Sequence, residues 1–308
     1  MQSFGGFLLQ RVLRAALTLW LVVSVVFIIL RLSGDPVVLL LSENASQDQI
    51  DALRANLGLN ASLPEQYARY WVSVIQGDLG QSLRQRQPAL GLVLERFPAT
   101  LQLAAAAFGL AAVLGLTIGV LAALTRGTAW DRLAMATISV LQSGPAFFVG
   151  IVLILVFSVR LGWLPTSGRG GWKHLILPAV TLSGFTMASL ARLARSALLD
   201  VLRLDFIRTA RAKGLNERTV IIQHALRNAA LPLITVMGLE LGGLLTGAVI
   251  TETVFAWPGI GRLAVNAVST RDYPLVQASV VFIALVFIAI NFAIDCSYGL
   301  IDPRVRNS

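Results

Sequence analysis

Six long apolar stretches, separated by polar segments, limit what this chain can fold into more than any other feature of its sequence. A helix that crosses the hydrocarbon core of a bilayer needs roughly 20 predominantly apolar residues. The stretches fall at residues 12–30, 99–124, 133–159, 175–193, 229–251 and 278–300. The 308-residue chain is 56% hydrophobic and 13% charged, more apolar than a water-soluble core of this size requires. The sequence therefore predicts an all-α integral membrane protein, one domain over 1–308, with six transmembrane helices.

The positions of the basic residues predict which side of the membrane each segment faces. Cytoplasmic segments carry an excess of Lys and Arg, although a loop as long as the one after the first span largely escapes this rule. With both termini in the cytoplasm, the inner segments hold more than half of the 25 Lys and Arg residues. The first span is predicted to stay uncleaved, because the residues after it, Arg31-Leu32-Ser33-Gly34, make a poor signal-peptidase site.

Residues 32–98, between the first two spans, are polar enough to lie in water. Ser46 with Gln49, and Ser62 with Glu65, have the spacing of a capping box, in which two side chains bind the first free backbone groups of a helix. The second helix would carry an aromatic face made of Tyr67, Tyr70 and Trp71. The sequence thus predicts an external helical insertion whose two short helices pack on an apolar surface.

Glycine and proline predict local features within the later spans. Gly115 and Gly119 have the spacing at which two helices pack closely. Gly144-Pro145, near the middle of the third span, predicts a kink, because proline cannot donate a helical hydrogen bond. Trp257-Pro258-Gly259 predicts a turn in the outer segment after the fifth span.

The segment 195–228, between the fourth and fifth spans, is the most basic part of the chain. Seven arginines and one lysine lie between residues 192 and 227, against three acidic residues. Apolar residues recur on both sides at the three-and-four spacing of amphipathic helices. Gly214 between them can adopt a left-handed turn at little steric cost. Two short helices at a sharp, positively charged corner are predicted; the alternative is a basic loop that only sets membrane topology.

Several chemistries lack the residues that they would need. The chain has no GxxxxGKS/T motif to cradle ATP phosphates, and no GxSxG, HExxH or CxxC motif. His174 and His224 fall on opposite sides of the predicted membrane, so they cannot bind the same metal ion. With these motifs missing, no metal site, catalytic residue or bound cofactor is expected. Cys296 is the only cysteine, which excludes an intrachain disulfide. The net charge of +9 arises mostly from arginines at span ends, which fits membrane topology better than nucleic-acid binding.

The basic segment also resembles a known family. Thr209-Ala210-xxx-Gly214 is similar to the EAA loop of ABC importer permeases, and RTARAKGL followed by HALRN resembles the dipeptide and oligopeptide branch. Thr209 stands where the general loop has alanine, and His224-Ala225-Leu226-Arg227 stands where Ile-x-Leu-Pro is usual; both departures resemble the peptide branch. FAWPGIGRL, RDYP and the terminal DPR add to the resemblance, which extends over essentially the whole chain.

The resemblance implies the first permease subunit of a bacterial inner-membrane importer that moves peptides, of di-, oligopeptide or glutathione-like type, by alternating access. It implies a heterodimer with a second permease, two ABC ATPases that bind ATP and Mg, and an extracytoplasmic binding protein; a nickel-type permease is the alternative within the family. The chain itself would not be an enzyme. The ATPase would contact eight residues at the corner of the loop: Arg208, Thr209, Ala210, Arg211, Ala212, Lys213, Gly214 and Leu215.

Two acidic residues inside predicted spans suggest a different class, an ion-coupled secondary transporter that uses Glu240 and Asp295. The basic loop has no role in that mechanism, and Asp295 also fits a polar seam with Asn291, Tyr298 and Asp302. Glu240 lies about 16 Å into the fifth span, near the midplane, on one face with small and polar residues. We expect this face to line the translocation path and Glu240 to bind the substrate's amino terminus; the alternative is a protonated Glu240, or one paired with the partner permease. The predicted path consists of Glu240, Gly243, Gly247 and Thr251.

Overall fold

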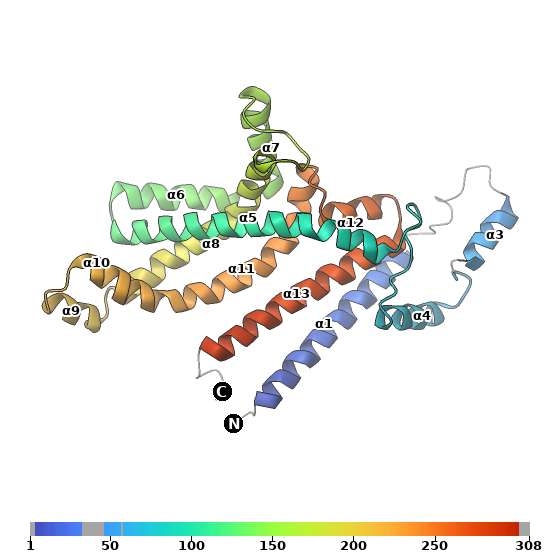
Figure 1. Cartoon of the computed structure of the whole chain (residues 1–308), viewed down its shortest axis with the longest axis horizontal. Helices are drawn as coiled ribbons and strands as arrows, with labels where there is room; N and C mark the ends of the chain where they lie inside the picture. Colours follow the sequence, from blue (N-terminus) through green and yellow to red (C-terminus); the bar gives the residue numbers. More distant parts are fainter. Residues whose placement is uncertain (1–3, 33–45, 57, 302–308) are drawn as a thin grey trace. The chain divides into compact units, whose positions relative to one another are not determined.

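The computed structural model describes residues 4–32, 46–56 and 58–301, and these residues are almost entirely helices and turns (Figure 1). The all-α class is confirmed. Five helices are long and apolar enough to cross a membrane. They are α1 (Phe4–Leu32), α5 (Ala89–Leu124), α8 (Trp172–Val201), α11 (Arg227–Val254) and α13 (Tyr273–Ile301).

The predicted third span is broken rather than merely kinked. It consists of α6 (Ala129–Ser143) and a second segment formed by α7 (Ala146–Leu153) and the π-helical turns η1 (Ile154–Arg160), bent by 105°. Gly144 and Pro145 both have extended backbone angles, with ψ of 139° and 133°. A residue before proline is pushed out of the helical region, and proline has no N–H to continue the helix. If this bent pair counts as one span, the described residues contain up to six spans by length and composition.

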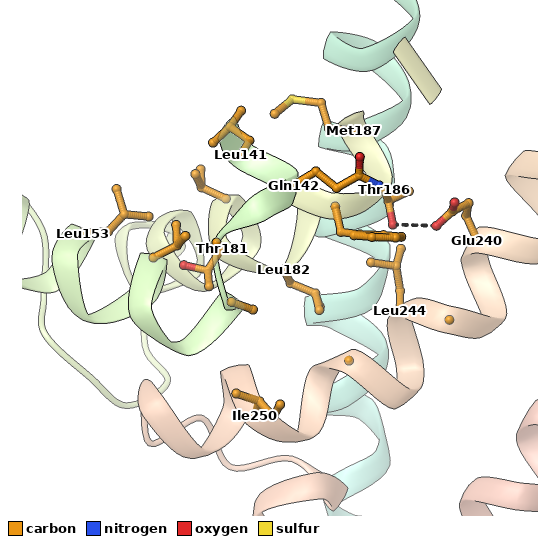
Figure 2. Close-up of a pocket in the computed structure, with 18 residues that line it drawn as sticks. Leu141, Gln142, Leu153, Thr181, Leu182, Thr186, Met187, Glu240, Leu244 and Ile250 are labelled. Atoms are coloured by element: carbon orange, nitrogen blue, oxygen red, sulfur yellow. Dashed lines mark hydrogen bonds between the residues drawn. The ribbon is translucent and has the colours of Figure 1, made fainter. Parts of the chain in front are cut away.

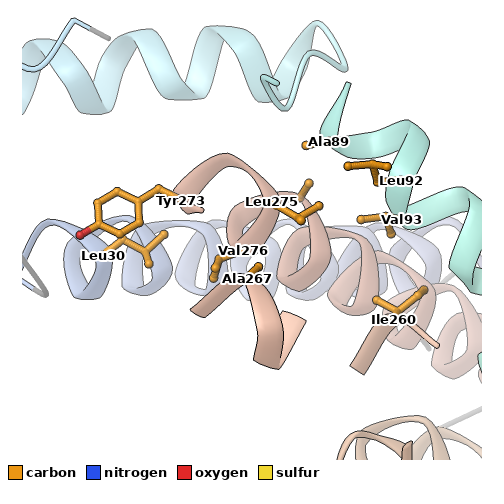
Figure 3. Packing of buried hydrophobic residues seen from close by; sticks show 10 residues of the cluster. Leu30, Ala89, Leu92, Val93, Ile260, Ala267, Tyr273, Leu275 and Val276 are labelled. Atoms are coloured by element: carbon orange, nitrogen blue, oxygen red, sulfur yellow. The ribbon is translucent and has the colours of Figure 1, made fainter. Parts of the chain in front are cut away.

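Contacts divide the chain into two compact units. The first unit contains residues 1–99, 258–293 and 299–308, and the second contains residues 100–257 and 294–298. In the first unit the end of α1, the start of α5, α12 (Ile260–Ser269) and the start of α13 share an apolar core (Figure 3). Its largest members are Leu30, Leu92, Ile260, Tyr273 and Leu275. Because this core holds the start of α5, that helix begins ten residues before the predicted span.

The external insertion forms α3 (Gln47–Asn56) and α4 (Leu63–Ile75). The capping box of α3 is formed in both directions, with Ser46 and Gln49 exchanging backbone-to-side-chain hydrogen bonds of 3.1 and 3.4 Å. The predicted box of α4 is wrong, since Ser62 makes no capping hydrogen bond and Glu65 instead pairs with Arg69 one turn later.

The predicted aromatic face of α4 packs on α1. The Tyr67 hydroxyl lies 2.7 Å from the Ser24 hydroxyl, and the Phe27 ring is 5.4 Å from the ring of Tyr67 and 5.8 Å from that of Tyr70. Burial with no hydrogen-bond partner raises the pKa of the Tyr70 phenol. The apolar surface on which the insertion rests is therefore the last turns of the first span.

In the second unit, α5 and α8 pack without room for a side chain between them. A Cβ atom on Gly115 would lie 2.8 Å from the Met187 carbonyl oxygen, and one on Gly119 would overlap the carbonyl oxygen of Ala191. The close-packing face predicted from the glycine spacing is thus confirmed. On α11, Gly238 packs similarly against Ile294 of α13, at 3.0 Å from the missing Cβ.

Candidate functional site

The basic segment folds into two helices joined at a sharp corner. α9 (Asp205–Ala212) ends at Lys213, and α10 (Glu217–Thr219) continues through π-helical turns, η2 (Val220–Leu226), into α11. Gly214 has a φ of +78°, and its N–H and that of Leu215 bond to the carbonyl groups of Arg211 and Ala210. This is the glycine-terminated helix end that the sequence predicts. A Cβ on Gly214 would meet nothing within 4 Å, so the backbone angle alone demands glycine.

One face of this loop is buried against the spans. Ile207 and Ala210 of α9 and Val220 and Ala225 beyond the corner form a core with Leu198 at the end of α8. Ala210 is only 7% exposed, so it serves packing, whereas the other seven residues of the predicted ATPase contact are exposed. The sequence alternates small and charged residues here, and this pattern does not show which small residue faces the core. The burial of Ala210 could therefore not be predicted.

Arg211 holds the corner closed from outside. Its guanidinium donates two hydrogen bonds to Glu217, at 2.6 and 3.1 Å, across the turn. This hydrogen-bonded pair lowers the pKa of the Glu217 carboxyl below its usual value and raises that of Arg211. Arg211, one of the eight residues expected to contact the ATPase, is thus engaged within the loop, while Arg208 lies 3.4 Å from Asp205.

A pocket of about 380 Å³ lies in the second unit between α6, α7, α8 and α11 (Figure 2). Glu240, Gly243 and Gly247 of α11 form part of its wall, and most of the remaining wall is apolar. The Thr186 hydroxyl of α8 donates a hydrogen bond to a Glu240 carboxylate oxygen at 3.1 Å. Two glycines on the α11 wall keep the pocket wide beside the only carboxylate in its lining.

Thr251, the fourth residue of the predicted path, does not line this pocket. It is 1% exposed, and its hydroxyl is buried with no hydrogen-bond partner in the described structure. The reason is α7, whose Gly150 lies so close to Val254 and Phe255 that an added Cβ would be 3.3 and 3.1 Å from their side chains. The helix face continues as predicted, but α7 covers its last turn.

Sequence patterns missed the other polar residues of the pocket. Thr186 and Gln142 come from α8 and α6, where each is one of several small or uncharged polar residues and no motif singles it out. Only the pairing of helices brings them to Glu240. The side chains of Asp295 and Tyr298 and all of Asp302 lie outside the described residues, whereas the Asn291 amide bonds to the carbonyl of Phe287 on its own helix. No cluster of three potential metal-binding side chains occurs among the described residues.

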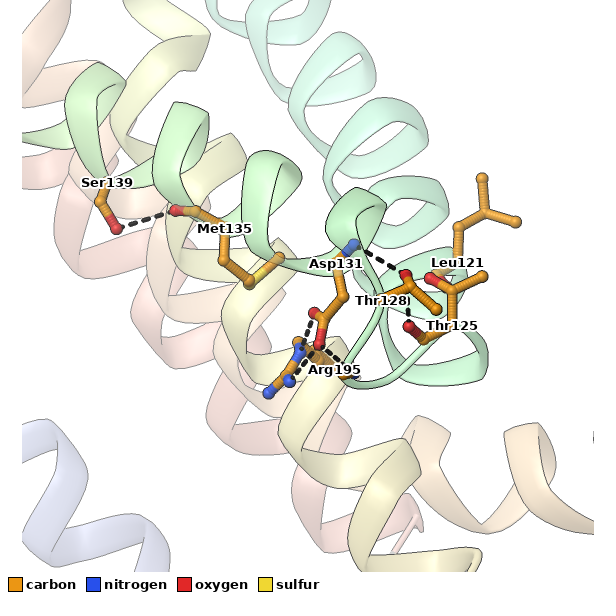
Figure 4. A network of polar contacts seen from close by, with 8 residues as sticks. Leu121, Thr125, Thr128, Asp131, Met135, Ser139 and Arg195 are labelled. Carbon is orange, nitrogen blue, oxygen red and sulfur yellow. Dashed lines mark hydrogen bonds and ion pairs between the residues drawn. The ribbon is translucent and has the colours of Figure 1, made fainter.

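An ion pair joins α6 to α8 near the end of α8 that leads into the loop (Figure 4). Arg195 donates two hydrogen bonds to Asp131, at 2.7 and 2.8 Å. Asp131 also accepts from the Gly127 N–H, and its own N–H bonds to the side chain of Thr128, the cap of α6. It lies in the first turn of α6 and ties that helix to α8. Elsewhere in the unit, Glu252 of α11 is fully buried and accepts a hydrogen bond from Thr100 at 2.6 Å.

Comparison with known proteins identifies the fold and the family. Two family models match, an N-terminal model of binding-protein-dependent transport membrane components over residues 5–104, and the binding-protein-dependent transport system inner membrane component over residues 115–307. The chain belongs to this permease family. The permease is 42% identical over 302 residues to the glutathione transport system permease protein of Escherichia coli, covering 98% of this chain and 99% of that one. The corresponding protein of Salmonella paratyphi A is 43% identical over the same length.

The fold of the permease is also found in solved structures. It superposes on the methionine ABC transporter MetNI in inward-facing crystal forms with TM-scores of 0.54 and 0.59, at 21% identity. The match covers 68% and 70% of this chain and 97% and 98% of those chains. The family match and the apolar helices identify the permease as a multi-pass inner-membrane transport protein, not an enzyme.

Proposed function

We propose that the chain is the first of two permease subunits in an ATP-driven importer of short peptides, of the dipeptide, oligopeptide or glutathione type. The observation that carries this is the 42% identity, along nearly the whole chain, with a permease named for glutathione transport. A second permease would complete the translocation path. Two ABC ATPases, with their ATP and Mg, would supply the energy, and an extracytoplasmic binding protein would deliver the substrate. The chain itself binds no cofactor in this scheme.

The loop from Asp205 to Leu226 is the proposed ATPase contact. Its corner presents Arg208, Lys213 and the Gly214 turn on the outside, and its inner face is fixed to α8. A rigid element with one buried and one charged face suits transmission of a movement from a partner with an acidic groove. This charged, folded corner has no role in an ion-coupled secondary transporter, and no observation favours nickel as the substrate.

The pocket beside Glu240 is the proposed substrate path. A carboxylate held by Thr186 in a mostly apolar wall would attract a single positive group, such as the α-ammonium of a peptide. The volume of about 380 Å³ is at the small end of ligand pockets and suits part of a short peptide. During alternating access the pocket would open in turn to each side of the membrane.

The proposed function is tested with the binding protein encoded beside the permease gene. Native mass spectrometry should find glutathione or a short peptide retained by that protein. The same substrate should stimulate ATP hydrolysis by the reconstituted complex of two permeases and two ATPases. Retention of a nickel complex would overturn the peptide assignment. If the loaded binding protein does not stimulate ATP hydrolysis, the proposed importer function is contradicted.

The proposed topology places both termini and the loop in the cytoplasm and the insertion outside. A cysteine introduced at Asn60, in the insertion, should react with an impermeant maleimide added to intact cells. One at Asn216, in the loop, should react only after the membrane is permeabilised. Labelling of both positions from outside would contradict the arrangement.

A further inference from the structure

A second pocket, separate from the proposed substrate path, lies in the first unit and has a volume of about 390 Å³. It lies between the turn at residues 81–88, the start of α5, α12 and the start of α13. Three arginines line it: Arg84, Arg96 and Arg262. The only acidic residue in its lining is Asp272. Arginine in this number suits an oxyanion, because each guanidinium can donate two parallel hydrogen bonds.

Asp272 keeps its negative charge beside the three arginines, and its carboxylate also fixes the turn. It is 2% exposed and accepts hydrogen bonds from the Ser82 hydroxyl at 2.5 Å and the Leu83 N–H at 3.1 Å. The Ser82 hydroxyl oxygen accepts in turn from the N–H of Gln85. Arg84 therefore extends from a turn that is held rigidly, and little ordering is needed when a ligand binds.

Helix α12 adds to the positive potential. Gly259 precedes its first turn and lines the pocket with Arg262 and Asn266 of the same helix. The N-terminus of a helix carries a partial positive charge, which favours phosphate and other anions. Side-chain and backbone charges of one sign thus converge on the same space.

The pocket lies near the level of lipid headgroups. The part of α5 from Arg96 to Leu124 is about 42 Å long at 1.5 Å per residue, comparable with the roughly 40–45 Å thickness of a bilayer with its headgroups. Leu94 on α5 and Val265 and Val268 on α12 are exposed apolar side chains of the two helices that carry Arg96 and Arg262. An anion with a hydrocarbon tail matches both features.

We infer that this pocket binds the phosphate group of an anionic phospholipid. The headgroup phosphate would lie among Arg84, Arg96 and Arg262, and the acyl chains would cover the exposed residues of α5 and α12. Arg96 also lies 3.8 Å from the exposed Glu95 carboxylate, so the lipid phosphate would be an additional partner for it. A bound lipid would join the insertion to the membrane-spanning part of the first unit. This inference concerns lipid binding and does not depend on the transported substrate.

The test is native mass spectrometry of the full-length protein taken from nanodiscs of phosphatidylglycerol or of phosphatidylcholine. The wild-type protein should retain phosphatidylglycerol in preference to phosphatidylcholine. Arg84→Gln combined with Arg96→Gln should weaken that retention about tenfold or more, since each lost charge-assisted hydrogen bond is a substantial part of the affinity. Arg69→Gln, which removes one charge from the same external region outside the pocket, should leave retention unchanged.

Three results would overturn the inference. Equal loss in Arg69→Gln and in the pocket variant would mean general charge attraction. Saturable binding of glycerol phosphate or inorganic phosphate without retention of lipid would assign the pocket to a soluble anion. Unchanged lipid retention in the pocket variant, with weaker binding of the extracytoplasmic binding protein, would assign it to an acidic side chain of that protein.

Discussion

Replacing Arg195 by alanine should destabilise the protein more than replacing its partner, Asp131. Asp131 is 5% exposed as a side chain, whereas Arg195 is 28% exposed. Without the arginine, a carboxylate stays buried with only the Gly127 N–H as a donor at 3.0 Å. Without the aspartate, the guanidinium can still reach water.

The expected magnitudes follow from this asymmetry. Removing one partner of a buried ion pair costs about 3–5 kcal/mol. The remaining backbone hydrogen bond and the positive N-terminus of α6 offset part of this, so Arg195→Ala should cost about 3 kcal/mol. For Asp131→Ala we expect about 1–2 kcal/mol from the lost side-chain hydrogen bonds to Arg195 and the Gly127 N–H, because the Thr128 cap uses only the backbone N–H of residue 131 and is kept.

The assay is equilibrium unfolding of the purified chain in mixed micelles, with both single variants and the double variant. Their free energies of unfolding should be strongly non-additive, because the two residues share one interaction. Arg69→Ala is the matched control, since its pair with Glu65 is exposed and should contribute at most about 0.5 kcal/mol. Equal, additive effects at Arg195 and Asp131 would refute the reasoning.

Three further predictions concern the loop, the pocket and the helix packing. Gly214→Val should leave the permease in the membrane but sharply reduce ATPase recruitment in a pull-down, because valine resists a φ of +78°. Gly214→Asn, which tolerates that angle, should still recruit the ATPase. Normal recruitment by the valine variant would exclude the loop as the contact. Glu240→Gln should weaken substrate-stimulated ATP hydrolysis through apparent affinity in an intact complex, and dissociation of the two permeases instead would assign Glu240 to assembly. Gly119→Ala should lower the free energy of unfolding by about 1–3 kcal/mol, whereas Gly109→Ala, whose Cβ has open space, should not lower it.

The sequence predicted best those features that one residue type imposes on its own backbone. Gly214 has the left-handed angle expected of it, because the requirement is local to a single residue. Gly115 and Gly119 pack as expected, because two residues without side chains on one helix face leave a groove that a neighbouring helix can fill. The apolar stretches located the spans for the same reason, since the bilayer sets their length whatever their neighbours are.

Features that depend on a second element were not predictable in this way. Asp131 and Arg195 are 64 residues apart, and each taken alone is a charge near the end of a span. The Thr186 hydroxyl reaches Glu240 across 54 residues. The break at Gly144-Pro145 was located, but its angle of 105° depends on what α7 packs against, including the end of α11. Ser62 illustrates the same limit on a smaller scale, since Arg69 competes successfully for Glu65.

Helix α8 connects the pocket and the loop without an intermediate. Thr186 in the pocket wall, Arg195 in the ion pair and Leu198 in the core of the loop follow one another over about 18 Å of one helix, all beyond its internal Pro178. The other pocket wall, α11, begins where the loop ends. The loop is thus the direct covalent link between the two helices whose side chains, Thr186 and Glu240, meet across the pocket.

A tilt of the loop must therefore act on both walls of the pocket together. Leu198 is fully buried in the core of the loop, so α8 cannot remain still when the loop moves. The glycine contacts at Gly115 and Gly119 prevent α5 from separating easily, and the bond between Arg195 and Asp131 makes α6 follow. The hydrogen bond between Thr186 and Glu240 joins α8 to α11 across the pocket, so movement of α8 relative to α11 would change the pocket at the carboxylate.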